Sequence, residues 1–332
     1  MKSFFKRIAL FVGIGLILYA GVYCASETLV YRYAKTNRFY QIKTSRVETY
    51  DWVILGASHP MPFDYQDMNA RLEEMTGLTV INLATPGNGI VPNRFVLQYF
   101  LQKHNARNVL YCLDSFIFYS RAWNENRFQD VKLFQRAPLD STLAKDLLGY
   151  SFQEGIAYTV FLDYISGFSK INNRDRFKPD IREDEAKFER NYRFLKSRDM
   201  ERIKYLYPSE KVDEQVFQHF LTKFVDLIDF LKTRGINLII LKPPIPSHIY
   251  EMLPQESVFD ERIKGILTEK GVPFYDFSLV ANSRENFYDT DHLNRKGVLN
   301  FFSNYLKPVL VKHAAPAPSI PPPAVIPPKD QA

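Results

Sequence analysis

A serine at the end of an apolar run is the residue whose position most directly suggests chemistry. The stretch "WVILGASHPMPFD" begins at Trp52 and passes through Gly56 to Ser58 and His59. A serine hydroxyl attacks an acyl group when a base takes its proton, another group orients the base and N–H donors stabilise the oxyanion. Ser58 is therefore either part of an ordinary turn or a nucleophile whose partners lie elsewhere in the chain.

A base and an orienting carboxylate occur together in "FYDTDHLNRKGV", near the C-terminus. Asp289 and His292 are three residues apart, a spacing that in a turn brings a carboxylate to the imidazole nitrogen facing away from the nucleophile. Asp291 is a rival for this role, although its position next to the histidine directs its side chain elsewhere in most backbone conformations. Alternatively, the segment only begins a helix that Asn294 caps.

Backbone N–H donors are expected from "INLATPGNG", where Gly87 and Gly89 follow an apolar run. Glycines permit a tight backbone path that leaves N–H groups facing a ligand. The closure of a loop without any ligand explains the same glycines equally well. Ser58 and Gly87 are thus the candidate backbone donors of an oxyanion hole.

Two further residues are candidates for contacts with a substrate. His59 stands beside the serine, although adjacent side chains point in different directions. Lys242, in "LKPPIPSHIY", follows an apolar run and could bind an anionic acceptor, while a solvated loop lysine is the simpler interpretation. His248, on the same loop, is expected at the surface. The sequence contains no recognisable metal-ligand spacing and no Gly-rich phosphate loop, so no metal or cofactor is predicted.

The elements around these residues indicate an α/β fold. Short, nearly continuous apolar runs are typical of strands covered on both faces of a parallel sheet. Helical patterns lie between them, the clearest over 212–234, with Gly235 as its C-terminal stop. This alternation predicts a doubly wound sheet with right-handed crossovers. The strand candidates are "DWVILG" (51–56), "LTVINL" (78–83), "NVLYCL" (108–113), "INLIIL" (236–241) and "VPFYDF" (272–277).

One large domain is predicted over 51–313. It includes a helical insertion at about 115–207, which we expect beside the strand ends, where α/β proteins build their binding crevices. The charged part of this insertion, from 170 to 203, is either a solvated face or part of a site. The segment 314–332 is dense in Pro and Ala and is expected to form an extended, disordered tail.

The N-terminus carries a predicted membrane anchor. Basic residues precede an uncharged run from Ile8 to Ala25, which is near the minimum length for a membrane-spanning helix. A cleaved signal peptide is the alternative, but its apolar part is usually shorter, about 7–15 residues. The basic N-terminal tail favours an orientation with the rest of the chain outside the cytoplasm. Residues 1–25 are thus the anchor, and the polar, Tyr-rich segment 26–50 is a linker.

Composition argues against other classes of protein. The chain has 332 residues and a net charge of +6 that is spread along its length. Because no dense Lys/Arg block with interleaved aromatic residues occurs, nucleic acid is not an expected partner. Cys24 lies in the anchor and Cys112 in a predicted buried strand, so no disulfide is expected between them.

Three of these segments together resemble the SGNH (GDSL-type) hydrolases. That family places its nucleophilic serine just after the first strand, an Asn-x-x-x-x-Gly stretch after the second and Asp-x-x-His near the C-terminus. Here "LGASH" supplies Ser58, "NLATPG" supplies Asn82 and Gly87, and "DTDH" supplies Asp289 and His292. The resemblance implies a flavodoxin-like SGNH fold, with a central parallel sheet flanked by helices, and a Ser–His–Asp triad.

One block departs from the family pattern. Where a Gly-x-Asn-Asp turn commonly follows the third strand, this chain has "YCLDSFIFY" (111–119), which contains no Asn. Ser115 could donate a hydrogen bond to the oxyanion in place of that Asn, whereas an ionised Asp114 would repel an oxyanion. Asp114 is therefore expected to have a structural role in the turn.

The anchored arrangement is similar to the membrane-tethered branch of the family, which includes the D-alanyl transfer protein of teichoic acids and proteins that acylate exported polysaccharides. The resemblance implies a single-pass protein of the bacterial cytoplasmic (inner) membrane with a periplasmic domain and a membrane-bound O-acyltransferase as partner. Such a protein transfers acetyl or D-alanyl groups from an acyl donor to a cell-envelope polymer, or hydrolyses such esters. The alternative is a non-catalytic anchored scaffold that binds the acyltransferase or the polymer.

Overall fold

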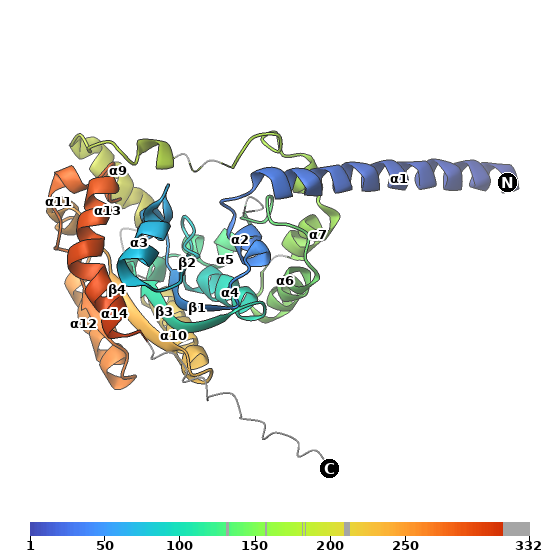
Figure 1. Cartoon of the computed structure of the whole chain (residues 1–332). Coiled ribbons are helices and arrows are strands. Elements are labelled where there is room, and N and C mark those ends of the chain that lie inside the picture. Colours follow the sequence, from blue (N-terminus) through green and yellow to red (C-terminus); the bar gives the residue numbers. More distant parts are fainter. Residues whose placement is uncertain (131–132, 157, 181, 183, 209–212, 315–332) are drawn as a thin grey trace, which may run out of the picture.

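The computed structural model describes residues 1–130, 133–156, 158–180, 182, 184–208 and 213–314. Its centre is a sheet of five parallel strands in the order β2-β1-β3-β4-β5, which is the flavodoxin-like order. Figure 1 shows this sheet among the helices, with β1 to β4 labelled. Each strand lies within or overlaps one of the five predicted apolar runs, so the predicted α/β class and its strands are confirmed. The strands are β1 (Thr49–Leu55), β2 (Val80–Asn82), β3 (Asn105–Cys112), β4 (Asn237–Lys242) and β5 (Phe274–Asp276).

The apolar strands bury both faces of the sheet. In β1, Val53 and Leu55 belong to one hydrophobic core, while Trp52 and Ile54 belong to a second core on the other face. Side chains of a strand alternate between faces, so a strand covered on both sides needs apolar residues at every position. This requirement explains why the strand candidates are continuous apolar runs.

Helices cover the two faces. The predicted helix over 212–234 is confirmed as α10. Asp213 caps its N-terminus, because its side chain accepts hydrogen bonds from the N–H groups of Gln215 and Val216. Gly235, with a φ of +67°, follows its C-terminus. The first core is covered mainly by α4 (Ile90–Leu101), α10 (Glu214–Lys232) and α12 (Glu256–Glu269), and the second by α3 (Met68–Thr76), α13 (Arg295–Phe301), a π-helical turn (Phe302–Leu306) and α14 (Lys307–Lys312).

The predicted insertion between β3 and α10 is helical in its described part. Short 3₁₀ turns at Ser115–Phe118, Arg121–Trp123 and Glu185–Lys187 accompany its α-helices. These helices are α5 (Glu125–Phe128), α6 (Ser141–Gln153), α7 (Tyr158–Ser166), α8 (Phe168–Ile171) and α9 (Lys196–Leu206), and a further short helix, α11 (Ser247–Tyr250), follows β4.

The N-terminal helix α1 (Lys2–Tyr33) is long and apolar enough to cross a membrane, and its N-terminal part extends away from the domain (Figure 1). It continues beyond residue 25, and α2 (Arg38–Thr44) follows it and buries Phe39 and Ile42 in the first core. The interpretation of 26–50 as a linker is therefore corrected, because its apolar side chains pack into the domain. The Pro- and Ala-rich tail lies outside the described residues from 315 onward.

A buried ion-pair cluster joins three segments that are distant in the sequence. Asp64, in the turn after β1, pairs with Arg38 of α2 and with Arg182 of the insertion. All three side chains are at most 10% exposed. Removing one partner of a buried ion pair leaves an uncompensated charge in a poorly solvated place. Asp64 therefore holds both α2 and the insertion against the turn that follows β1.

Replacing the central carboxylate should destabilise the whole domain. We expect Asp64→Asn to lower the free energy of unfolding by about 3–5 kcal/mol, because it leaves two buried guanidinium groups without a counter-charge. Denaturant unfolding of the full chain in detergent micelles, followed by tryptophan fluorescence, measures this loss. The matched control is Asp175→Asn, which removes an exposed pair with Lys178 and should change stability by less than about 0.5 kcal/mol. Equal losses in the two variants would contradict the assignment.

Candidate functional site

The turn after β1 depends on a glycine. Gly56 has a φ of +149°, and a Cβ atom there would lie 2.8 Å from Cγ of Pro60 and 2.9 Å from the carbonyl oxygen of Cys112. A larger residue would therefore displace the turn that carries Ser58. Buried Asn82, at the end of β2, fixes the other side of this turn by donating a hydrogen bond of 2.7 Å to the carbonyl of Pro60. Ser58 is thereby held at the carboxyl edge of the sheet.

The loop after β2 is tied to the same turn by Asn93 of α4. Its side-chain oxygen accepts from the N–H of Gly56 at 3.3 Å, and its amide nitrogen donates to the carbonyls of Asn88 and Gly89 at 3.0 and 2.8 Å. Asn93 is not among the residues predicted from the sequence. The available signal was an amide near the start of the mostly apolar helix "IVPNRFVLQYFL", which is buried in the structure. A buried amide of this kind usually bonds to backbone groups that need fixing.

Ser58, Gly87 and His292 line one cavity of about 300 Å³ at the carboxyl edge of the sheet. Gly87 has a φ of +68°, and a Cβ atom there would lie 3.1 Å from the ring of Trp123. In the described part of the chain, the N–H groups of Ser58 and Gly87 donate to no other backbone group. Three of the residues that the sequence predicts for the site are therefore brought together, with two N–H donors available.

His292 is oriented by Asp289, as the spacing predicts. The Nδ1 atom lies 3.0 Å from each carboxylate oxygen of Asp289. Oδ1 of Asp289 also accepts from the backbone N–H groups of Asp291 and His292, which closes the turn. Among the described residues, the buried Nε2 atom of His292 has no hydrogen-bond partner. The ring thus presents a free nitrogen, and His292 has the geometry of a base.

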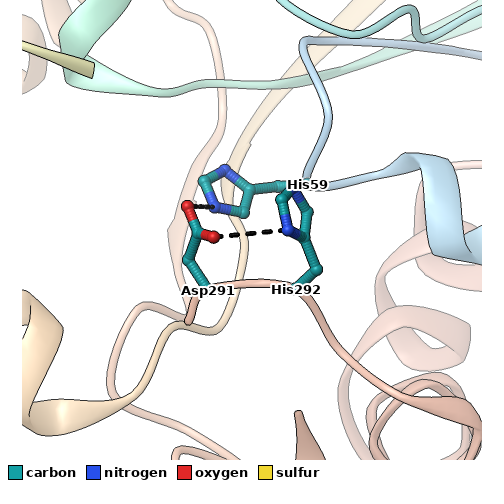
Figure 2. A group of neighbouring side chains, drawn as sticks. All are labelled: His59, Asp291 and His292. Carbon is teal, nitrogen blue, oxygen red and sulfur yellow. Dashed lines mark ion pairs between the residues drawn. The ribbon is translucent and has the colours of Figure 1, made fainter. Parts of the chain in front are cut away.

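Asp291 does not point away from this histidine. Its Oδ1 lies 3.3 Å from Nδ1 of His292 and its Oδ2 lies 3.3 Å from Nε2 of His59 (Figure 2). The same Oδ2 lies 2.8 Å from Nε of Arg202. The Asp289 turn folds the chain back, which corrects the expectation that Asp291 is directed elsewhere. Burial opposes ionisation of Asp291, but the nearby Arg202 and histidines hold its pKa well below the usual range. Asp291 is therefore a buried anion that serves three basic side chains.

His59 is a buried member of this network. Its Nδ1 lies 2.6 Å from Oδ1 of Asp114, and its ring centroid is 5.1 Å from that of His292. Burial lowers the pKa of His59, but the charges and hydrogen bonds of Asp114 and Asp291 outweigh burial and raise it to about 10. Asp114 thus has a structural partner in the turn after β3. His59, predicted as a substrate contact, is instead held between two carboxylates.

The same group contains residue types that bind metals. Potential ligand atoms of His59, Asp291 and His292 all lie within 4.8 Å of one another. However, Arg202 already pairs with Asp291, and Asp114 with the other nitrogen of His59. Arg202 and Asp114 balance the charges of Asp291 and His59. An ion-pair network therefore explains why these acidic and basic side chains lie together.

Ser115 and Lys242 lie on a separate, smaller cavity of about 30 Å³ that His59 and Asp291 also line. The hydroxyl of Ser115 contacts Tyr207 and Glu256. The ammonium of Lys242 contacts Glu256 and Asp260 at 2.5 and 2.6 Å, and the residue is only 4% exposed. The expectation of a solvated loop lysine is therefore wrong, because α12 places two carboxylates over the end of β4. Neither side chain lines the cavity of Ser58.

Basic and aromatic residues that were not predicted from the sequence also line the Ser58 cavity. Arg202 and Arg127 line it together with the rings of Trp123 and Tyr205, which lie 5.1 Å apart. Within the described part of the chain, the buried Nη2 atom of Arg202 has no hydrogen-bond partner. Arg202 belongs to the charged 170–203 segment, so this segment contributes to the cavity and is not only a solvated face.

The His59 network predicts a pH-dependent stability. The folded-state pKa of about 10 lies above the ordinary value of 6.5, so the stabilisation is complete below about pH 6.5 and is lost as the pH rises through 10. The wild type should therefore lose its stability advantage over His59→Asn between pH 7 and pH 10.5. Denaturant unfolding of both proteins across this range measures the difference, and a difference that does not change with pH would contradict the assignment.

A search with protein-family models and a search of curated proteins each found no match to this chain. The arrangement of its own residues therefore carries the argument for its chemistry. That arrangement is a serine at the carboxyl edge of a parallel sheet, two available N–H donors and a carboxylate-held histidine around one cavity.

Proposed function

We propose that this protein is a membrane-anchored, SGNH-like serine O-acyltransferase or esterase that acts on O-acyl esters of cell-envelope polymers. The observation that carries the proposal is the shared cavity of Ser58, Gly87 and His292, with Asp289 bound to the far nitrogen of the imidazole. A nucleophile, a base and an oriented carboxylate around one space are the requirements of acyl transfer through an acyl-enzyme.

The reaction begins when Nε2 of His292 accepts the proton of the Ser58 hydroxyl as Oγ attacks the acyl carbonyl carbon. The N–H groups of Ser58 and Gly87 stabilise the resulting oxyanion. As the tetrahedral intermediate collapses, the bond to the leaving alcohol breaks and His292 returns its proton to that alcohol. Throughout these steps, Asp289 fixes the imidazole tautomer and stabilises the imidazolium.

The acyl group on Ser58 is then passed to a second nucleophile. A sugar or polyol hydroxyl of an envelope polymer gives the transferase, and water gives the esterase, with His292 again acting as base. The apolar helix α1 favours the transferase, because tethering beside a membrane-bound O-acyltransferase raises the effective concentration of the acyl donor. In this proposal α1 crosses the bacterial cytoplasmic membrane once, and the domain lies on the periplasmic side.

A non-catalytic scaffold is the second candidate, and one observation favours it. The hydroxyl of Ser115, which could have replaced the missing Asn donor, is engaged with Tyr207 and Glu256. The oxyanion hole then has only backbone donors from the predicted set. A scaffold would use the same cavity to bind a polymer or the acyltransferase without forming a covalent intermediate.

Reaction with a fluorophosphonate distinguishes an enzyme from a scaffold. We expect intact-mass analysis of the full chain in detergent to show one adduct, located on Ser58, because only an activated serine reacts readily with this reagent. Ser58→Ala and His292→Ala should both abolish it. Ser303→Ala, which changes an exposed serine of the C-terminal helical region, is the matched control and should label like the wild type. A folded wild type that forms no adduct would favour the scaffold.

The two carboxylates beside His292 should have separable effects. Asp289→Asn is expected to slow labelling of Ser58 by roughly 100-fold or more, because an amide no longer fixes the correct tautomer. Asp291→Asn should slow labelling less, but lower the free energy of unfolding by about 3–5 kcal/mol, since Arg202 loses its buried counter-charge and His59 loses one of its two carboxylate partners. Labelling time courses and denaturant unfolding of both variants test this pattern. The reverse pattern would make Asp291 the orienting residue.

A further inference from the structure

The insertion packs directly against the apolar part of α1. The Tyr19 hydroxyl donates a hydrogen bond of 2.8 Å to the carbonyl of Ser166, at the end of α7. One turn later along α1, Tyr23 packs on Gly167, where an added Cβ atom would lie 1.9 Å from the ring. Glu27 then forms an ion pair with Lys170 of α8. The domain is therefore held against α1 from Tyr19 onward.

These contacts leave too little free helix to cross a bilayer. The uncharged run begins at Ile8, so only Ile8–Leu18 precedes the first contact with the domain, a length of about 16 Å at 1.5 Å per residue. Even from Lys2 the free length is about 25 Å. The hydrocarbon core of a bilayer is about 30 Å thick. If α1 spans the membrane, the end of α7 must lie within the depth of the bilayer.

The exposed surface of α7 and α8 is rich in apolar side chains, as contact with the bilayer requires. Tyr158, Leu162, Ile165 and Phe168 are 48%, 44%, 39% and 62% exposed. The first three follow helical spacing along α7, so they lie on one face. The charged residues nearby are satisfied within the protein, because Asp163 accepts hydrogen bonds from Ser169 and Lys170 is buried against Glu27. The exposed surface of α7 is thus mainly apolar and carries no exposed charge, with Thr159 and Ser166 as its exposed polar residues.

We propose that α7 and the start of α8 insert their apolar face into the outer surface of the lipid bilayer beside α1. The inference rests on the proposed function only in that α1 crosses the membrane. The uncharged run ends at Ala25, which we place at the outer boundary of the hydrocarbon core. Tyr19 precedes Ala25 by six residues and therefore lies about 9 Å below this boundary. Amphipathic helices in membrane interfaces bury their apolar faces to a similar depth, about 5–10 Å. Tyr19 and Tyr23 then lie at the level where membrane-spanning helices carry aromatic residues.

Site-specific quenching by labelled lipid tests this placement. In a Cys24→Ser background, single cysteines are introduced as Leu162→Cys, Phe168→Cys, Leu16→Cys and Val258→Cys, and each is labelled with the fluorophore NBD. The full chain is reconstituted into vesicles of phosphatidylcholine and phosphatidylglycerol. These contain unlabelled lipid alone, lipid that carries a nitroxide near the top of its acyl chain, or lipid that carries a nitroxide near the chain end, which reports on Leu16 at the middle of the bilayer. Leu16 reports insertion of α1, and Val258 is a matched apolar position, 49% exposed, on α12.

We expect the lipid with a nitroxide near the top of its acyl chain to quench the labels at positions 162 and 168 by roughly half, as for an interfacial helix, and to leave position 258 nearly unchanged. Quenching at 16 without quenching at 162 and 168 would overturn the inference while leaving the anchor in place. Absence of quenching at 16 would overturn both the inference and the membrane-spanning role of α1. Neither outcome depends on the reactivity of Ser58, which the fluorophosphonate experiment measures separately.

Discussion

The buried carboxylate of Asp291 is the interaction on which the site depends. Its two oxygens face His292, Arg202 and His59, which come from three segments of the chain. Bringing the buried rings of His59 and His292 next to the partly buried Arg202 costs free energy unless an anion between them compensates. Asp291, itself 2% exposed, supplies that anion and fixes the positions of the segments that bear the basic groups. The nucleophile turn, the insertion and the C-terminal loop are thereby held around one cavity.

The parallel sheet explains why these segments meet. The loops that follow β1, β2 and β3 all leave the same edge, so the residues they carry lie close together although they are distant in sequence. Buried Asn82 and Asn93 then bond to the backbone of these loops and leave little freedom in their paths. Such rigidity suits a site in which two N–H groups must be ready before an oxyanion develops.

The insertion connects the apolar N-terminal helix α1 with the candidate nucleophile. Its α7 and α8 pack on α1, Arg182 pairs with Asp64 in the 3₁₀ turn that follows Ser58, and Arg202 lines the cavity itself. The orientation of the domain relative to α1 is thus set by the same segment that shapes the cavity. In the proposed transferase, this arrangement would hold Ser58 at a fixed height above the membrane that carries the acyl donor.

The sequence by itself determined the elements and the local part of the site. Continuous apolar runs indicated strands buried on both faces, and a three-residue spacing indicated that Asp289 could reach His292. Both are short-range properties, which the backbone geometry of a strand or turn dictates.

The tertiary structure alone decided the remaining contacts of the site. Arg202 and Asp291 are 89 residues apart, His59 and Asp114 are 55 apart, and Gly56 and Asn93 are 37 apart. It also decided that Lys242 is buried, because α12 supplies its two carboxylates after the chain has crossed the end of β4. No local pattern records such pairings, since the burial that makes each one necessary arises only when the sheet and the insertion pack together.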